Sequence, residues 1–266
     1  MKTEIALING SRCLPAPGLR GSCQFCGQDM IAKCGEQLTW HWAHKGKRAC
    51  DAWWESEGPW HREWKTNFPT DFHEKIHFDA NGEKHIADVE LPSGLVIELQ
   101  HSQMPLEEMR SRETFYKRMI WVVDAAPFRK NLWIFDPLPD PSLPLVDDLV
   151  FYPPQPEWRN NNIVREKGYN ALMFFRRSSR DPGSALVQVE SGRSLNADFK
   201  STYIGHRLFL WMRPRDVWYQ TTHPTYLDLG DGMLGRLMRY KSDADDPWCL
   251  HLVSKEAFIR DLLRIV

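Results

Sequence analysis

Residues 85–102, HIADVELPSGLVIELQHS, decide how the middle of the chain folds. Apolar residues alternate with charged or polar ones on both sides of residues 92–94, which is typical of two strands joined by a turn. The apolar residues of both strands occupy odd-numbered positions. They form one continuous face only if the residues that flank the three-residue turn pair with each other. This register predicts that Asp88 lies directly opposite Glu98.

Two carboxylates that face each other on neighbouring strands repel. The Cβ atoms of such a pair lie about 4.5–5.5 Å apart, and a cation between the carboxylates removes the repulsion. Asp88 and Glu98 are therefore candidate ligands of Mg²⁺ or Mn²⁺, cations that prefer oxygen ligands and keep several waters. The alternative is a solvent-exposed strand face, on which acidic residues are common.

Three polar residues with helical spacing precede this hairpin. Glu57, His61 and Lys65 follow one another at intervals of four residues and would share one face of a helix over 53–67. Gly58-Pro59 interrupts the first turn and is an alternative start for the helix. A histidine beside a carboxylate–metal pair can orient or deprotonate a water molecule. The alternative for His61 is a surface position on an amphipathic helix.

A second helix is expected over 106–119, after Gln100. Arg112 and Tyr116 are four residues apart on it, so both would point back at the strand ends. The alternatives are a solvated arginine and a tyrosine at the edge of the core. From residue 55 to 136 the expected order is α, β, β, β, α, β, β, with strands at 75–78, 85–91, 95–101, 120–123 and 132–135.

Cysteine is concentrated near the start of the chain, where five of the six cysteines lie within the first 50 residues. We expect no secretory signal in these residues, so clustered Cys and His indicate a metal site rather than disulfides. The Cys23-x-x-Cys26 spacing can give two thiolates to one tetrahedral ion. The other ligands must come from a second set, which comprises Cys34, His41, His44 and Cys50.

His41 and His44 are expected on opposite faces of one strand, so they would rarely ligate together. We favour a closed structural Zn²⁺ site formed by Cys23, Cys26, His44 and Cys50, which would hold together a segment with a small core. Cys34 and His41 remain alternatives for one of these four ligands. The alternative is a group of reduced thiols in a hydrophobic patch.

The composition is that of an ordinary globular protein of 266 residues, with 42% hydrophobic and 26% charged residues. The net charge of −1 excludes a uniformly basic coat for nucleic acid but not a local basic groove. No apolar run reaches the length of about 18 residues that a membrane span needs. We therefore expect a cytoplasmic protein without a membrane partner.

The sequence predicts three parts. Residues 1–52 form a Cys/His zinc-binding module with extended runs at 30–32 and 37–43, and residues 53–137 form the core. Residues 138–266 begin with a proline-rich linker and continue as an α/β region of unknown role. In that region strand-like runs occur at 185–189, 207–212 and 226–229, and a final helix is expected over 255–265.

Four strings, taken together and in order, resemble the competence protein CoiA-like family: CQFCG at 23–27, HWAHK at 41–45, ADVELPSGLVIELQHS at 87–102 and RSRETFYKRMIWVVDA at 110–125. Proteins of that kind resemble PD-(D/E)XK nucleases fused to a zinc knuckle. The resemblance implies a restriction-endonuclease-like αβββαβ core within an α+β or α/β fold. It also implies Mg²⁺-dependent hydrolysis of DNA phosphodiesters, in DNA uptake, recombination or mobile-DNA processing.

The resemblance also assigns roles to single residues. The metal-binding acids fall on Asp88 and Glu98, and the third position of the motif, usually Lys, falls on Gln100. The helix-borne acid and histidine fall on Glu57 and His61, and the zinc ligands fall on the four residues favoured above. Because Gln100 offers a dipole where Lys offers a positive charge, other groups must stabilise the transition-state charge.

In the resulting mechanism Gln100 and His61 orient the attacking water. Contacts to the substrate come from Lys65, Arg112 and Tyr116.

DNA is the expected partner, together with a second copy of the chain or a recombination protein, and no small-molecule cofactor is expected. Trp40 and Trp42 would grip nucleic acid by stacking, or would pack in the core. A competing hypothesis is a non-catalytic DNA-binding recombination-accessory protein on a degenerate nuclease fold. A further alternative is a structural zinc protein that acts on other proteins.

Overall fold

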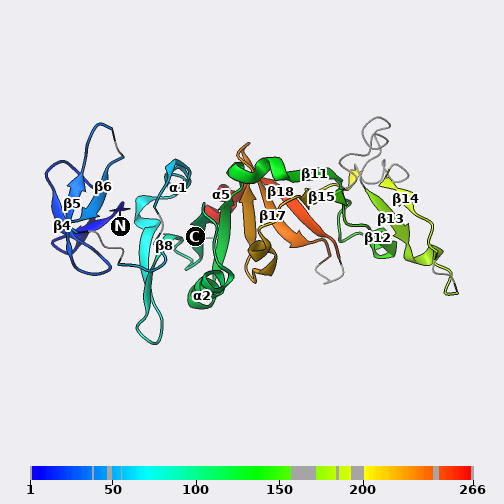
Figure 1. The fold of residues 1–266 in the computed structure, drawn as a ribbon, viewed down its shortest axis with the longest axis horizontal. Coiled ribbons are helices and arrows are strands. Elements are labelled where there is room, and N and C mark those ends of the chain that lie inside the picture. Colours follow the sequence, from blue (N-terminus) through cyan, green and yellow to red (C-terminus); the bar gives the residue numbers. More distant parts are fainter. Residues whose placement is uncertain are drawn as a thin grey trace. The chain divides into compact units, whose positions relative to one another are not determined.

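The computed structural model describes residues 2–37, 39–46, 50–54, 56–156, 172–183, 186–192, 201–241 and 246–264. These residues form a mixed α+β protein with large sheets and few helices (Figure 1). The chain divides into two compact units, Met1–Val122 with Asp261–Val266 and Val123–Arg260. The mixed fold class is thus confirmed, whereas the three-part division at residues 52 and 137 stays a prediction.

The first unit begins with a six-stranded antiparallel sheet in the order β1-β6-β5-β4-β2-β3. A small core of Ala6, Cys23, Phe25, Met30 and Trp42 packs beside it. Both extended runs expected here contain strands, although residue 38 lies outside the described residues. The strands are β1 (Lys2–Thr3), β2 (Ala6–Ile8), β3 (Ser11–Cys13), β4 (Arg20–Ser22), β5 (Asp29–Lys33) and β6 (His41–His44).

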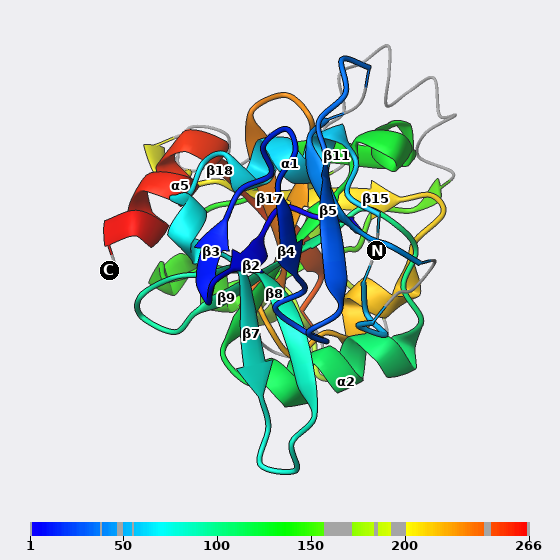
Figure 2. The same ribbon diagram turned by 90° about the vertical axis from the view of Figure 1, so that its left-hand side faces the viewer.

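The rest of the first unit has the expected order α, β, β, β, α, β (Figure 2). Its strands lie in the order β10-β9-β8-β7. The first helix begins at Pro59 with Gly58 as its N-cap, so the shorter alternative was right. The elements are α1 (Pro59–Lys65), a 3₁₀ turn (Thr70–Phe72), β7 (His73–Phe78), β8 (Lys84–Glu90), β9 (Val96–Gln100), α2 (Leu106–Tyr116) and β10 (Met119–Asp124).

The hairpin of β8 and β9 has the register expected from sequence. Val89 pairs with Ile97, and the amide of Leu91 donates to the carbonyl of Leu95 at 3.0 Å. Gly94 closes the turn with a φ of +77°, a conformation that glycine adopts without a steric penalty. Burial alternates along β8, but all five residues of β9 are buried. The polar face of β9 is therefore interior, and the solvent-exposed alternative for that face is wrong.

The second unit contains strands in the order β11-β15-β18-β17-β16 and a three-stranded sheet, β12-β13-β14. Its elements are β11 (Leu132–Pro137), β12 (Leu149–Phe151), β13 (Met173–Arg176), β14 (Glu190–Ser191), β15 (His206–Trp211), β16 (Thr225–Asp228), β17 (Met233–Arg239), β18 (Trp248–Ser254) and α5 (Lys255–Arg264), with 3₁₀ turns at Ala126–Asn131, Pro144–Asp148, Arg177–Ser179 and Asp216–Gln220.

The expectations for the second unit hold in part. The runs at 207–212 and 226–229 correspond to β15 and β16, and the final helix corresponds to α5. Residues 186–189 are irregular, whereas residues 185 and 265 lie outside the described residues. Among the helices that the structure describes, none is long and apolar enough to cross a membrane.

Candidate functional site

Asp88 and Glu98 are held against each other by the backbone of the two strands that carry them. The Asp88 carboxylate accepts a hydrogen bond from the Leu99 amide at 2.9 Å, and the Asp88 amide lies 3.4 Å from Glu98 Oε1. Glu98 is only 2% exposed. Burial of two carboxylates this close together is costly unless a positive charge compensates them.

His61 reaches Asp88 from α1. Its Nε2 donates to Asp88 Oδ1 at 2.9 Å. Burial alone would lower the pKa of His61, but the charge of Asp88 raises that pKa above its ordinary value. Burial likewise opposes ionisation of Asp88, yet the charge and hydrogen bond of His61 hold its pKa down at about 2. The two side chains therefore form an ionised pair between a buried histidine and a half-buried carboxylate, and the surface alternative for His61 is wrong.

Arg112 reaches Glu98 from α2, as its helical spacing predicted. Its guanidinium donates to Glu98 Oε2 at 2.9 Å and to the carbonyl of Trp53 at 2.8 Å, and it also pairs with Glu108. Burial and the charge of Asp88 nevertheless raise the pKa of Glu98 to about 8. Glu98 is therefore the carboxyl that gains most from a further positive charge.

Lys65 is interior, at 2% exposure. Its ammonium pairs with Glu57 and lies 3.3 Å from Glu74, and these carboxylates hold its pKa above the usual range despite burial. Glu57 precedes the first residue of α1, so it does not share a helix face with His61 and Lys65 as expected. It nevertheless contacts Lys65 through an ion pair. In this position Lys65 holds two carboxylates in place.

Gln100 and Tyr116 both lie next to the acid pair. Gln100 is 1% exposed, and its amide nitrogen is 3.2 Å from Ser102 Oγ. The buried hydroxyl of Tyr116 has no hydrogen-bond partner among the described residues. Burial, with the charges of Glu98 and Asp88, raises the pKa of Tyr116 well above its usual value. Tyr116 thus lies beside the acid pair, as its helical spacing predicted, and its contact with substrate stays a prediction.

A cavity of about 40 Å³ remains at this site, lined by Glu57, His61, Asp88, Glu98 and Gln100 among others. A single water needs roughly 10–15 Å³, so the cavity has room for an ion with part of its hydration. The potential ligand atoms of Glu57, His61 and Asp88 all lie within 4.8 Å of one another. Glu98 is not a member of that group, and one of its oxygens pairs with Arg112.

A second cluster lies at the N-terminal sheet and the segments that follow β4 and β6; its ligand atoms, from Cys23, Cys26, His44 and Cys50, all lie within 4.8 Å of one another. Cys23 and Cys26 flank a tight turn closed by Gly27, which has a φ of +73°. His44 is the last residue of β6. His41 makes a local contact instead: its Nδ1 donates a hydrogen bond to the carbonyl of Thr39 at 2.8 Å.

The spacing within this cluster matches a tetrahedral ion. Zinc–ligand bonds imply sulfur–sulfur separations of about 3.8 Å and sulfur–nitrogen separations of about 3.6 Å. Cys23 and Cys50 have their sulfurs 3.7 Å apart, and His44 Nε2 is 3.3 and 3.8 Å from the sulfurs of Cys26 and Cys50. Burial and the Cys23 thiol raise the pKa of Cys50. The cluster is thus able to bind a metal such as zinc.

One short segment connects the two clusters, and sequence reasoning missed it. Asp51 follows the cluster residue Cys50 and accepts hydrogen bonds at 2.9 Å from His85 and from the Ile86 amide on β8. Trp53 offers its carbonyl to Arg112. The only sequence signal was the position of Asp51 directly after a candidate ligand.

The two tryptophans expected to grip nucleic acid have different environments. Trp42 is fully buried and donates to the Cys13 carbonyl at 2.9 Å, so it packs in the core. Trp40 is 50% exposed. A scan against protein-family models, a search of curated proteins and a search of solved structures each returned no match for this chain.

Proposed function

We propose that the chain is a metal-dependent DNA nuclease of the CoiA-like type, with a restriction-endonuclease-like core formed by α1, β7–β9, α2 and β10. The observation that carries this proposal is the pair of carboxylates at opposed positions of β8 and β9, the half-buried Asp88 and the buried Glu98. A fold gains little stability from two opposed acids of which one is buried and one half-buried, which makes a cation-binding role the better explanation.

Asp88 and Glu98 would hold a Mg²⁺ or Mn²⁺ ion, which would polarise the phosphate and acidify a bound water. The chain's own residues prepare this site. His61 keeps Asp88 ionised, and Arg112 fixes the orientation of Glu98. Gln100 faces the same cavity, where its amide can orient a water molecule. Lys65 holds Glu57 at the cavity wall, so we assign it a positioning role instead of a phosphate contact.

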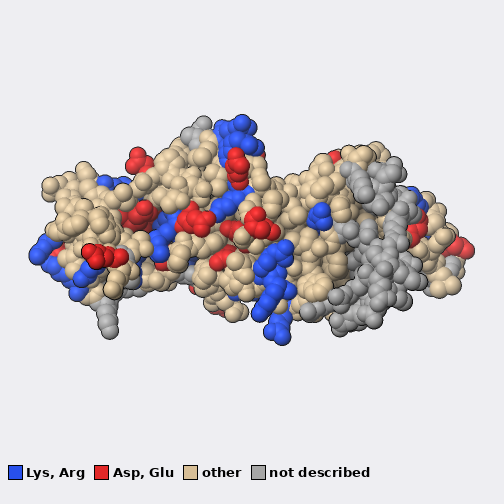
Figure 3. Space-filling view, turned by 90° about the horizontal axis from the view of Figure 1, so that it is seen from above, with Lys and Arg blue, Asp and Glu red and all other residues tan. Residues whose placement is uncertain are grey.

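The Cys23, Cys26, His44 and Cys50 cluster would hold a structural Zn²⁺, because the site offers four protein ligands and is closed. The nuclease would act in the cytoplasm on DNA, in uptake, recombination or mobile-DNA processing, with a second copy or a recombination protein as partner. Acidic and basic side chains are interspersed on the face shown in Figure 3. Such a face is not a uniformly basic coat for nucleic acid.

A non-catalytic DNA-binding protein is the second candidate, and one observation favours it. Each acid of the pair already has a cationic partner, His61 for Asp88 and Arg112 for Glu98. Such internal pairing lets a site persist without a metal ion. In that case neither acid contributes to DNA binding.

Cleavage of supercoiled and single-stranded DNA with Mg²⁺ or Mn²⁺ distinguishes these candidates. We expect Asp88→Asn and Glu98→Gln each to lower the cleavage rate at least a hundredfold while DNA binding persists, because the cation loses a charged ligand. The matched control is Glu90→Gln, a carboxylate on the same strand that pairs with His77 outside the cavity. If both acid variants cleave DNA as fast as the wild type, Asp88 and Glu98 are not the catalytic site. DNA binding by the wild type without any cleavage selects the second candidate.

A further inference from the structure

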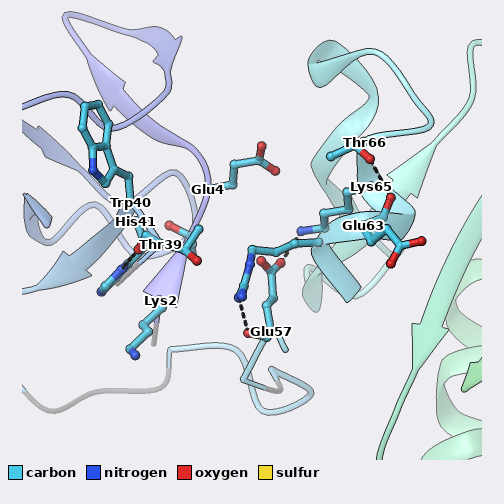
Figure 4. A pocket seen from close by; sticks show the side chains of 11 residues that line it. Lys2, Glu4, Thr39, Trp40, His41, Glu57, Glu63, Lys65 and Thr66 are labelled. Atoms are coloured by element: carbon cyan, nitrogen blue, oxygen red, sulfur yellow. Dashed lines mark hydrogen bonds and ion pairs between the residues drawn. The ribbon is translucent and has the colours of Figure 1, made fainter. Parts of the chain in front are cut away.

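A pocket of about 520 Å³ adjoins the acid site, because Glu57 and Lys65 line both of them. Three of its lining residues, Glu4, Glu57 and Glu63, carry carboxylates, and Figure 4 shows them among cationic neighbours. The lysines and arginines that line it are also three in number. These charges balance, so the pocket does not concentrate the positive potential that attracts a phosphodiester. The residues that bind DNA beside the acid site are therefore to be found outside this pocket.

A row of three aromatic rings leads from the core to the surface of the first unit. Trp64 is fully buried, Trp60 is half-buried and His101 is exposed. The centroid of the Trp60 ring lies 6.3 Å from that of Trp64 and 6.3 Å from that of His101. Aromatic rings interact at centroid separations of about 4.5–7 Å. Trp64 thus anchors the row, while its two outer rings are at least partly accessible from solvent.

The two outer rings lie beside the acid site. Trp60 precedes His61 on α1, and the centroids of their rings are 6.4 Å apart, while His61 itself pairs with Asp88 at 2.9 Å. His101 directly follows Gln100, which lines the acid-site cavity. That cavity has only about 40 Å³, which is enough for a hydrated ion but not for a nucleotide. A nucleotide at this site must therefore lie outside the cavity, where these rings are.

We propose that Trp60 and His101 hold one unpaired base of the DNA strand that is cut at the acid site. The identity of the ligand rests on the proposed nuclease function. A stacked base occupies about 3.4 Å, so two rings that hold a base between them lie about 7 Å apart. Trp60 and His101 are 6.3 Å apart with their planes tilted by 37°, so a small outward movement of the exposed His101 admits a base.

This arrangement selects a kind of substrate. The bases of a duplex are paired and stacked on both faces, so a base can enter between the two rings only after it leaves the duplex. The substrate of the acid site is accordingly a single strand or a single-stranded end. Every base has a flat aromatic face, so binding between the rings does not depend strongly on sequence.

The test is fluorescence anisotropy of a labelled 12-nucleotide oligo-dT and of a blunt duplex, with zinc-loaded protein and no added Mg²⁺. We expect His101→Ala to weaken single-strand binding about tenfold and to leave duplex binding unchanged. His101→Phe keeps a ring and should bind as tightly as the wild type. Because His101 is exposed, neither change disturbs the core. The matched control is Phe78→Ala, which removes a 68% exposed aromatic ring at the end of β7.

Trp60→Leu keeps an apolar contact with Trp64 but removes the ring, and it should weaken single-strand binding to a similar extent. A 5-bromouracil oligonucleotide should also cross-link to Trp60 or His101. The proposal is overturned if the wild type does not bind oligo-dT, if His101→Ala binds it as tightly as the wild type, or if His101→Phe is as weak as His101→Ala. A cross-link confined to other residues overturns it as well.

Failure of the nuclease is distinguishable from these outcomes. Ring-dependent binding of single strands without any cleavage refutes the nuclease alone. Cleavage of single strands at equal rates by wild type, His101→Ala and Trp60→Leu, with equal affinities, refutes the base-binding role alone.

Discussion

Removal of the ion proposed for the Cys23, Cys26, His44 and Cys50 cluster will unfold the N-terminal sheet. The strands there are only two to five residues long, and the buried core beside them is small. In peptides of comparable size a structural zinc contributes on the order of 10 kcal/mol to folding. Metal content measured by mass spectrometry, and hydrogen exchange of residues 2–46 before and after chelation, check this expectation.

The effect should extend to the acid site through the segment that follows Cys50. Asp51 fixes this segment to β8, and Trp53 supports Arg112. Cys50→Ser should therefore release the zinc and increase exchange in β8. Cys34→Ser is the matched control, because Cys34 is a partly buried thiol outside the cluster. One zinc per chain in both variants, or unchanged exchange after chelation, contradicts the proposal of a structural zinc.

Lys65→Met will destabilise the protein by about 3–5 kcal/mol, the usual cost of removing one partner from a buried ion pair. The substitution leaves Glu57 and Glu74 without their shared cation. Glu74 cannot move to solvent, because its oxygens accept hydrogen bonds from the Glu4 and Ile5 amides at 2.8 and 3.0 Å. Urea unfolding at pH 7 measures the change.

Two further variants separate the charge effect from lost packing. Lys33→Met removes an exposed lysine and should change the unfolding free energy by less than about 0.5 kcal/mol. Adding Glu74→Gln to Lys65→Met should recover part of the loss, because one of the two uncompensated charges is then gone. If Lys65→Met is as stable as wild type, the ammonium is not the group that holds these carboxylates.

The hairpin around Asp88 and Glu98 was predictable because two independent constraints coincide there. The alternation of apolar residues fixes which face is buried, and the length of the turn fixes the register. The zinc-type cluster was predictable for a similar reason, since the Cys-x-x-Cys spacing is local and the strand period separates His41 from His44.

The environment of these residues was not predictable. Glu98 is buried where α1 packs on β9 and where Arg112 of α2 contacts its carboxylate, and no local pattern reveals that packing. Glu74 is a key partner of Lys65 but has no helical or strand spacing relative to it. Its backbone adopts a φ of +48°, which a sequence reading does not expect for glutamate. Long-range contacts of this kind are set by tertiary packing, so the sequence did not predict the ion pair between Lys65 and Glu74.

The most direct test of the account is Mn²⁺ binding to the zinc-loaded protein, followed by electron paramagnetic resonance or calorimetry. The account predicts one Mn²⁺ site per chain in the wild type, weakened at least tenfold by Glu98→Gln and unaffected by Glu90→Gln. A wild type that binds no Mn²⁺, or equal affinities for all three proteins, contradicts the assignment of Asp88 and Glu98 as a cation site.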